Sequence, residues 1–230
     1  MIGIMLEGTV TSLEVFFLTL LFSVPFALFV AFGRMSKIRL LQKLVGFYLL
    51  IMRGTPLILQ LIFIYFAPKY LLLFLKETLS GYISSPVFWN SVTYILSYKR
   101  FTAVIIAFSL NYAAYFAEIY RGGIEAIPKG QYEAAKVLGF TKRRTFLHIV
   151  LPQMVKRILP ACGNEVITLV KDTALAQVIG VAELFHAAQN AAAREFSTMP
   201  IFIAGLFYLI MNWVVTIVFS SCEKKLSYYS

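Results

Sequence analysis

The sequence predicts an all-α, polytopic membrane protein, and its composition and long apolar runs are the observations that predict it. Of the 230 residues, 60% are hydrophobic and 14% are charged, whereas a soluble domain carries about 25% charged residues. The mean hydropathy is +0.78. Hydrocarbon offers no water to backbone N–H and C=O groups, so runs of about 20 apolar residues cross it as helices. We therefore expect residues 1–230 to form a single transmembrane domain in a lipid bilayer.

Five apolar segments are long enough to be predicted as transmembrane helices. Their approximate bounds are 15–32, 45–66, 101–120, 147–170 and 200–221. Within the second segment, the run Arg53-Gly54-Thr55-Pro56 predicts a kink, because proline cannot donate the helical hydrogen bond.

The basic residues predict how these helices are oriented. Loop 33–45 holds four basic residues and no acidic one, loop 121–145 is also basic, and Lys224 and Lys225 follow the last segment. Five spans place all of these on one side, which the excess of positive charge identifies as cytoplasmic. We therefore expect the N-terminus outside and the C-terminus in the cytoplasm. Segment 67–100 argues against this, because it is also basic yet would lie outside, and its role is left open.

Several function classes are excluded by what the chain lacks. The formal net charge is +10, but the basic residues gather in short loops, so no nucleic-acid partner is expected. Cys162 and Cys222 are far apart and indicate neither a disulfide framework nor a metal site. A phosphate-binding Gly-x4-Gly-Lys-Ser/Thr run is absent, so no cofactor is expected in this chain. Without a set of catalytic residues, the chain is predicted not to be an enzyme.

Loop 121–145 predicts a short helix in water on the cytoplasmic side. Ala134 and Ala135 favour a helix and Gly139 ends it. These small side chains can seat in a groove of another protein, and we expect Glu133 and Glu125 to contact that partner. The alternative for Glu125 is an ordinary surface pair with Arg121, four residues earlier.

Two predicted spans carry polar residues at helical spacing. Glu165, Thr168 and Asp172 follow an i, i+3, i+7 pattern and share one helix face, with Asn164 on a neighbouring stripe. Because polar groups are costly in hydrocarbon, this face is predicted to line a hydrated path. The alternatives are that Asp172 caps the following helix and that Asn164 binds a neighbouring helix.

The third span shows the same kind of face. Asn111, Tyr115 and Glu118 follow an i, i+4, i+7 pattern. Asn111 and Tyr115 are expected to line the path, whereas Glu118 has Arg121 as an alternative partner. Carboxylates on such a path can meet an ammonium or another cationic group.

The order of short motifs carries a family resemblance. Glu133-Ala134-Ala135 is followed after three residues by Gly139 and after nine more by Ile149-x-Leu151-Pro152. This spacing resembles the cytoplasmic loop of importer-type ATP-binding-cassette permeases. Further blocks resemble the polar amino-acid permeases of that class and stand at 53–57, 121–131, 163–165, 171–175 and 179–184.

The resemblance implies a permease subunit in a bacterial cytoplasmic (inner) membrane that moves a polar amino acid inward by alternating access. It implies separate ATPase subunits that bind ATP and magnesium and receive the 121–145 loop. It also implies a second permease subunit, identical or homologous, and an external solute-binding protein. Two alternatives stay open: another small solute, such as an organic cation or amino-acid derivative, or a channel or secondary transporter without an ATPase.

Overall fold

The computed structural model describes residues 2–79 and 85–226, and in this part of the chain every regular element is a helix. In chain order the helices are α1 (Ile2–Arg34), α2 (Arg39–Gly54), α3 (Leu57–Leu79), α4 (Pro86–Leu96), α5 (Arg100–Glu125), α6 (Lys129–Val137), α7 (Lys142–Thr145), the π-helix η1 (Phe146–Val150), α8 (Leu151–Asp172), the 3-10 helix η2 (Thr173–Ile179), α9 (Leu184–Glu195) and α10 (Met199–Leu226). The all-α prediction is confirmed.

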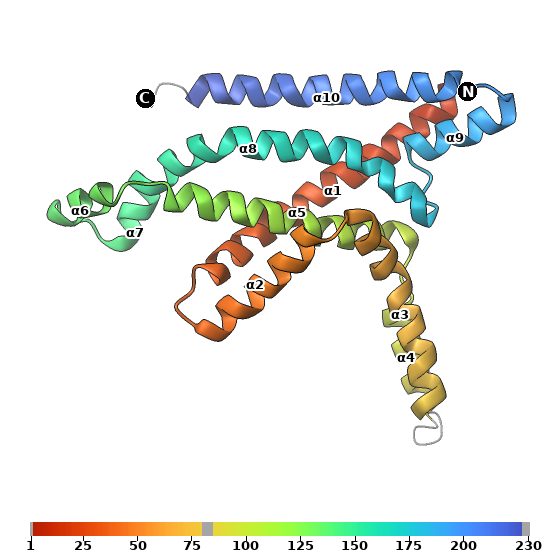
Figure 1. Cartoon of the computed structure of the whole chain (residues 1–230), viewed down its shortest axis with the longest axis horizontal. Coiled ribbons are helices and arrows are strands. Elements are labelled where there is room, and N and C mark those ends of the chain that lie inside the picture. The colour runs from red at the N-terminus through yellow and green to blue at the C-terminus, as the bar shows by residue number, and fades with distance from the viewer. Residues whose placement is uncertain (1, 80–84, 227–230) are drawn as a thin grey trace.

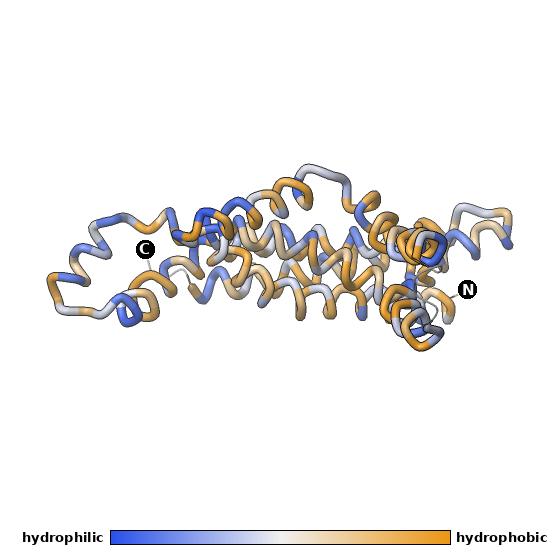
Figure 2. The backbone as a smooth tube through the Cα atoms, turned by 90° about the horizontal axis from the view of Figure 1, so that it is seen from below, coloured by the Kyte–Doolittle hydropathy of each residue, from blue (hydrophilic) through white to orange (hydrophobic). Residues whose placement is uncertain are grey.

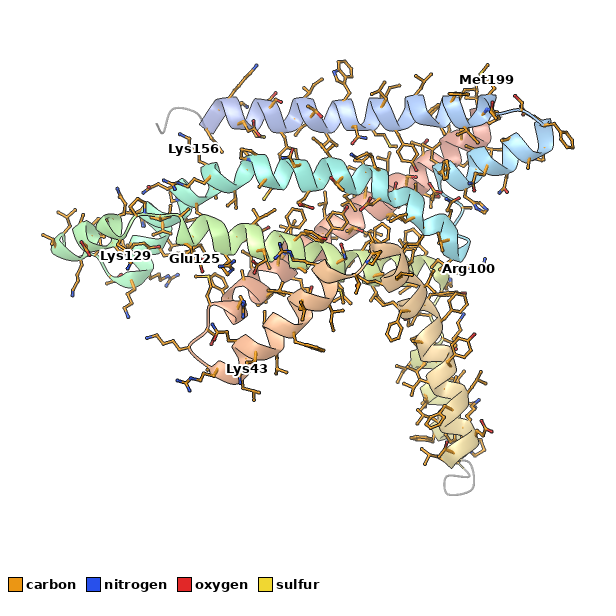
Figure 3. All side chains as sticks on the ribbon, viewed as in Figure 1. Lys43, Arg100, Glu125, Lys129, Lys156 and Met199 are labelled. Atoms are coloured by element: carbon orange, nitrogen blue, oxygen red, sulfur yellow. The ribbon has the colours of Figure 1, made fainter. Side chains whose placement is uncertain are left out.

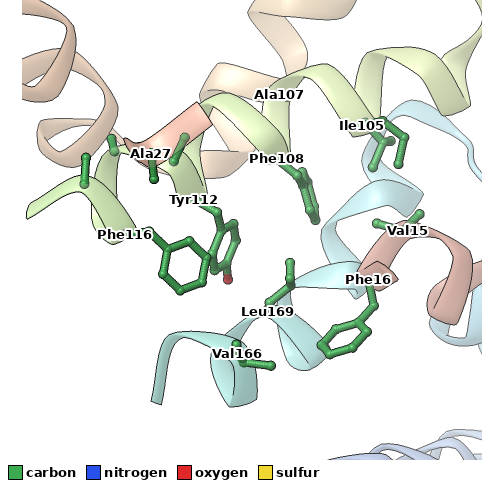
Figure 4. Close-up of a cluster of buried hydrophobic side chains, with 14 of the residues drawn as sticks. Val15, Phe16, Ala27, Ile105, Ala107, Phe108, Tyr112, Phe116, Val166 and Leu169 are labelled. Carbon is green, nitrogen blue, oxygen red and sulfur yellow. The ribbon is translucent and has the colours of Figure 1, made fainter. Parts of the chain in front are cut away.

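Helix α5 is the centre of the packing. It contacts α1, α2, α3 and α8, and α10 lies along α8 on the far side from α5 (Figure 1). Phe108, Tyr112 and Phe116 are buried on its α8-facing side (Figure 4). Small residues such as Ala107 and Ala117 alternate with these rings, and they let neighbouring backbones approach closely.

Among the residues that the structure describes, four helices are long and apolar enough to cross a membrane: α1, α3, α5 and α10. They overlap the predicted segments 15–32, 45–66, 101–120 and 200–221. The remaining segment, 147–170, corresponds to η1 and α8, which Lys156, Arg157 and Glu165 make more polar. The helices in the middle of the molecule are mostly hydrophobic, and hydrophilic stretches recur towards both ends (Figure 2).

The second predicted segment, 45–66, differs from the structure because two helices share it. Helix α2 ends at Gly54 and α3 begins at Leu57. Pro56 has no N–H, so the Met52 carbonyl four residues earlier loses its helical partner. Two side-chain amides replace it: Asn111 Nδ2 donates to Met52 O at 2.9 Å and Gln60 Nε2 at 3.0 Å. The break is thus hydrogen-bonded from α5 and α3.

Helix α3 also continues beyond the predicted end at residue 66. It runs through Pro68 to Leu79, although Pro68 leaves the Ile64 carbonyl without its N–H partner. The Tyr98 hydroxyl donates to that carbonyl. Lys69 Nζ lies 3.8 Å from the centre of the Tyr65 ring, which gives this charge a partner within the helix. Neither of these two contacts, of Tyr98 with Ile64 and of Lys69 with Tyr65, could be predicted from the local sequence pattern.

The basic loops of the sequence prediction lie towards one end of the molecule. Lys43, Lys129 and Lys156 lie towards one end, and Arg100 and Met199 towards the other (Figure 3). Helix α1 begins at the second end and α10 finishes at the first (Figure 1).

Candidate functional site

A cavity of about 470 Å³ lies where the start of α3 meets the middle of α5 and the end of α8. Small-molecule sites commonly have volumes of about 300–1,000 Å³. The lining residues are Thr55, Pro56, Leu57, Ile58, Asn111, Tyr112, Tyr115, Glu165, Thr168, Asp172 and Leu175. We call this the α3–α5–α8 cavity.

The cavity brings together most of the polar residues that helical spacing had grouped. Asn111 and Tyr115 reach it from α5, and Glu165, Thr168 and Asp172 reach it from α8. Asn164 does not belong to this lining, and its side chain is exposed. One residue corresponds to about 100° around a helix, which turns Asn164 away from the face of Glu165.

The two carboxylates of the cavity differ in whether they accept a hydrogen bond within the chain. Asp172 Oδ2 accepts a bond of 2.8 Å from the Tyr112 hydroxyl, and its side chain makes no capping bond to the backbone of η2. The capping alternative for Asp172 is therefore wrong in this conformation. In the described part of the chain, the half-buried Glu165 has neither a hydrogen bond nor an ion pair. Glu165 thus has its full accepting capacity available towards the cavity.

The neutral polar residues are partly occupied. Asn111 is buried, and its amide nitrogen donates to Met52 O and, at 3.0 Å, to Gln60 Oε1. That leaves its carbonyl oxygen as the group that can meet a solute. The Thr168 hydroxyl donates to Asn164 O at 3.0 Å. No lysine or arginine is among the residues that line this cavity, so its formal charge comes from the two carboxylates.

A chain of ion pairs runs along α5 from the cavity towards the 121–145 loop. Glu118 is 3.3 Å from Arg53 Nη1 and 2.8 Å from Arg121 Nη2. Arg121 Nη1 is in turn 2.6 Å from Glu125. The alternative partner of Glu118 is therefore present, and Glu118 does not line the α3–α5–α8 cavity. The surface ion pair with Arg121 that was the alternative role of Glu125 is also present, although the Glu125 side chain remains 55% exposed.

Helix α6 forms within the 121–145 loop and projects from one end of the molecule (Figure 1). Gly139 ends it with a φ of 75°, in the left-handed region. The Gly139 N–H donates to Lys136 O at 3.0 Å and the Phe140 N–H to Ala135 O at 2.9 Å, which is the paired bonding of a Schellman cap.

The small residues of α6 do not all face outward. Glu133 and Ala134 are exposed, whereas Ala135 is only 1% exposed. Ala135 therefore packs within the loop and is not available to seat in a partner. Val137 and Leu138 are 88% and 70% exposed, and the sequence interpretation missed them. The signal was an apolar pair at the glycine-capped end of an otherwise polar helix.

Glu183 is a second residue whose role the sequence interpretation missed. It is completely buried and precedes α9, where it accepts bonds of 2.7 Å from the N–H groups of both Phe185 and His186. The Tyr208 hydroxyl of α10 donates to it at 2.9 Å. Burial raises the pKa of this carboxyl above its ordinary value of 4.5, and the hydrogen bonds oppose the shift. Glu183 therefore anchors the start of α9 against α10.

Comparisons with known proteins show which family the chain resembles. The family described as binding-protein-dependent transport system inner membrane component matches residues 23–228. The arginine transport system permease protein ArtQ of Bacillus subtilis (strain 168) is 34% identical over 98% of this chain and 93% of its own length. The L-cystine transport system permease protein TcyB of the same strain is 35% identical over 96% and 86%. The crystal structure of an amino acid ABC transporter with histidines contains a chain with a TM-score of 0.79 and 31% identity, covering 97% of this chain and 94% of that one.

Proposed function

Because the chain belongs to the family of inner membrane components of binding-protein-dependent transport systems, we propose that it forms the path by which an ATP-driven importer carries a polar amino acid into the cell. It acts by changing conformation and catalyses no reaction itself. Relatives named for arginine and L-cystine transport support an amino-acid cargo. So does the likeness to a solved amino acid ABC transporter.

The observation that carries the proposal is the α3–α5–α8 cavity. Its two carboxylates, Glu165 and Asp172, face a space of about 470 Å³ whose lining residues include no lysine or arginine. Every amino acid carries an α-ammonium group that a carboxylate can bind by charge-assisted hydrogen bonds. Asp172 is held in place by Tyr112, whereas Glu165 has no competing partner in the described residues. We assign Glu165 as the first partner of the ammonium group.

The surface of α6 supports contact with a separate ATPase subunit. Its exposed Glu133, Val137 and Leu138 combine one charge with a small apolar patch, as expected where a helix seats in a groove of another protein. ATP and magnesium belong to that subunit. A second permease subunit and an external solute-binding protein complete the assembly, with the N-terminus outside and the C-terminus in the cytoplasm.

Transport by the purified assembly in liposomes tests the proposal. The permease is co-purified with its partners, and uptake of labelled arginine, cystine and glutamine is measured with and without internal ATP. We expect ATP-dependent uptake that survives collapse of ion gradients, and we expect Glu165→Gln to abolish most of it. Glu195→Gln, on the exposed end of α9, is the matched control and should transport normally.

Two results would contradict the proposal. Uptake that follows an ion gradient and needs no ATP would identify a secondary transporter. Normal transport by the Glu165→Gln assembly would remove the α3–α5–α8 cavity from the path.

A further inference from the structure

A second cavity lies beside the first, on the other side of the break between α2 and α3. Its volume is about 350 Å³, and it is lined by Arg34, Gly46, Leu49, Leu50, Arg53, Gly54 and Glu118. Gly54 lines this second cavity and the adjacent Thr55 lines the first. The short segment between α2 and α3 therefore borders both spaces.

Arg53 is the side chain that spans the boundary. It lines the second cavity and pairs with Glu118 at 3.3 Å. Its guanidinium carbon is also 5.7 Å from the centre of the Tyr115 ring, and Tyr115 lines the first cavity. Because Arg53 ends α2 next to Gly54 and Pro56, it stands where the backbone is already released from helical bonding.

The second cavity has an excess of positive charge. Both oxygens of Glu118 accept bonds from Arg121, at 3.1 and 2.8 Å, so Arg53 shares a carboxylate that is already engaged. In the described part of the chain, the side-chain hydrogen bond of Arg34 is to a neutral group, the Gln42 carbonyl, at 3.3 Å. Two guanidinium groups therefore line this space with one shared carboxylate between them.

We propose that this second cavity is an exit-side subsite that binds the carboxylate of the transported amino acid through Arg53 and Arg34. The inference rests on the proposed function. Guanidinium groups bind carboxylates in a bidentate manner, so a zwitterion meets acidic groups for its ammonium in the first cavity and basic groups for its carboxylate in the second. The pair of Arg53 and Glu118 closes the boundary until the substrate carboxylate replaces Glu118 as the partner of Arg53.

Charge-selective labelling of the cavity tests this assignment. Leu50, an exposed residue of the lining, is replaced by cysteine in the full assembly after Cys162 and Cys222 are changed to serine. Anionic sulfonatoethyl and cationic trimethylammonium-ethyl methanethiosulfonates are then compared. One guanidinium at about 4 Å in a watery site changes a charged reagent's rate about fivefold (about 1 kcal/mol). We therefore expect the anionic reagent to react faster. Arg53→Gln should lower the ratio of the anionic to the cationic rate about 25-fold, because each reagent's rate changes about fivefold in opposite directions.

Protection experiments identify the ligand chemistry. The amino acid that the assembly transports should slow labelling, and its α-amide, which lacks the carboxylate charge, should not. Arg53→Lys keeps the charge but not the bidentate fork, so it should retain the reagent preference and lose much of the protection. Arg39→Gln, at the opposite end of α2 and outside the lining, is the control and should behave like the parent.

The outcomes separate this inference from the proposed function. If the parent assembly transports the amino acid but Arg53→Gln labels like Arg39→Gln, or the amide protects as well as the acid, the exit-side subsite is refuted. If anionic phospholipid in the vesicles blocks labelling and the amino acid does not, the cavity binds a lipid headgroup and the assignment is again refuted. If no ATP-driven uptake of an amino acid occurs at all, the proposed function itself fails.

Discussion

Replacing Glu183 with alanine should loosen α9 from the rest of the bundle, because this one carboxyl holds three elements together. It accepts two backbone bonds at 2.7 Å and one from Tyr208 at 2.9 Å, and Ser12 of α1 approaches it at 3.4 Å. A buried hydrogen bond contributes about 1 kcal/mol net. Counting the three short bonds, Glu183→Ala should lower the free energy of unfolding by about 3 kcal/mol.

Unfolding of the detergent-purified chain measures this effect, and Glu195→Ala at the exposed end of the same helix is the matched control. The control should change stability by less than about 0.5 kcal/mol. Hydrogen exchange should also increase in α9 for the Glu183 variant. If both variants unfold alike, the buried contacts of Glu183 do not stabilise the fold and the reasoning fails.

The pH dependence gives the same group a second signature. Glu183 lies between η2 and α9, outside the predicted spans, and burial raises its pKa from 4.5. A carboxyl whose pKa is higher in the folded chain binds its proton more tightly there. The stability that this provides is therefore fully present below pH 4.5 and is lost as the pH rises through the raised pKa. Glu183→Gln should flatten this part of the stability profile, and an unchanged profile would assign it to another group.

Three further changes probe the loop and the ion pairs. Glu133→Lys alters an exposed residue, so it should leave membrane insertion and stability intact but abolish uptake and substrate-stimulated ATP hydrolysis. Glu195→Lys is the control, and normal uptake by the Glu133 variant would refute docking through α6. Gly139→Ala meets no atom within 4 Å, so its cost comes from the φ of 75° and should be about 1–2 kcal/mol of local stability by hydrogen exchange. Gly130→Ala, also unobstructed but without positive φ, should not lose stability, and equal effects would contradict the backbone argument. Arg121→Gln removes two ion pairs that are partly exposed, so the free energy of unfolding should fall by only about 1 kcal/mol.

Helical periodicity could predict the candidate cavity because the relevant residues share faces of regular helices. Glu165, Thr168 and Asp172 reach the cavity together, since a helix that does not bend keeps residues i, i+3 and i+7 on one side. The Schellman cap at Gly139 was predictable for a similar reason, because glycine adopts positive φ without a steric penalty. Both inferences depended only on local geometry.

The two departures in helix bounds involve side-chain contacts that the local pattern does not contain. Pro56 lies between α2 and α3, and Asn111 and Gln60 bind the carbonyl it leaves free. Pro68 lies inside α3, and the Tyr98 hydroxyl binds the Ile64 carbonyl. Proline alone therefore did not determine whether a helix stops. At both prolines a side chain satisfies the freed carbonyl, and one sequence without a fold does not show that Asn111 and Tyr98 are close enough to do so.

The charges on α5 link the two ends of the proposed mechanism. Tyr115 lines the α3–α5–α8 cavity and contacts Arg53, Arg53 pairs with Glu118, and Arg121 bridges Glu118 to Glu125 at the end of α5. Such a chain transmits motion only if its pairs differ between two conformations. We therefore expect Arg121→Gln to hydrolyse ATP at the parent rate while uptake falls, because the loop can still dock but no longer biases the pair at the cavity boundary. Equal losses of hydrolysis and uptake would instead place Arg121 in docking itself, and unchanged uptake would show that force reaches the cavity through helix packing alone.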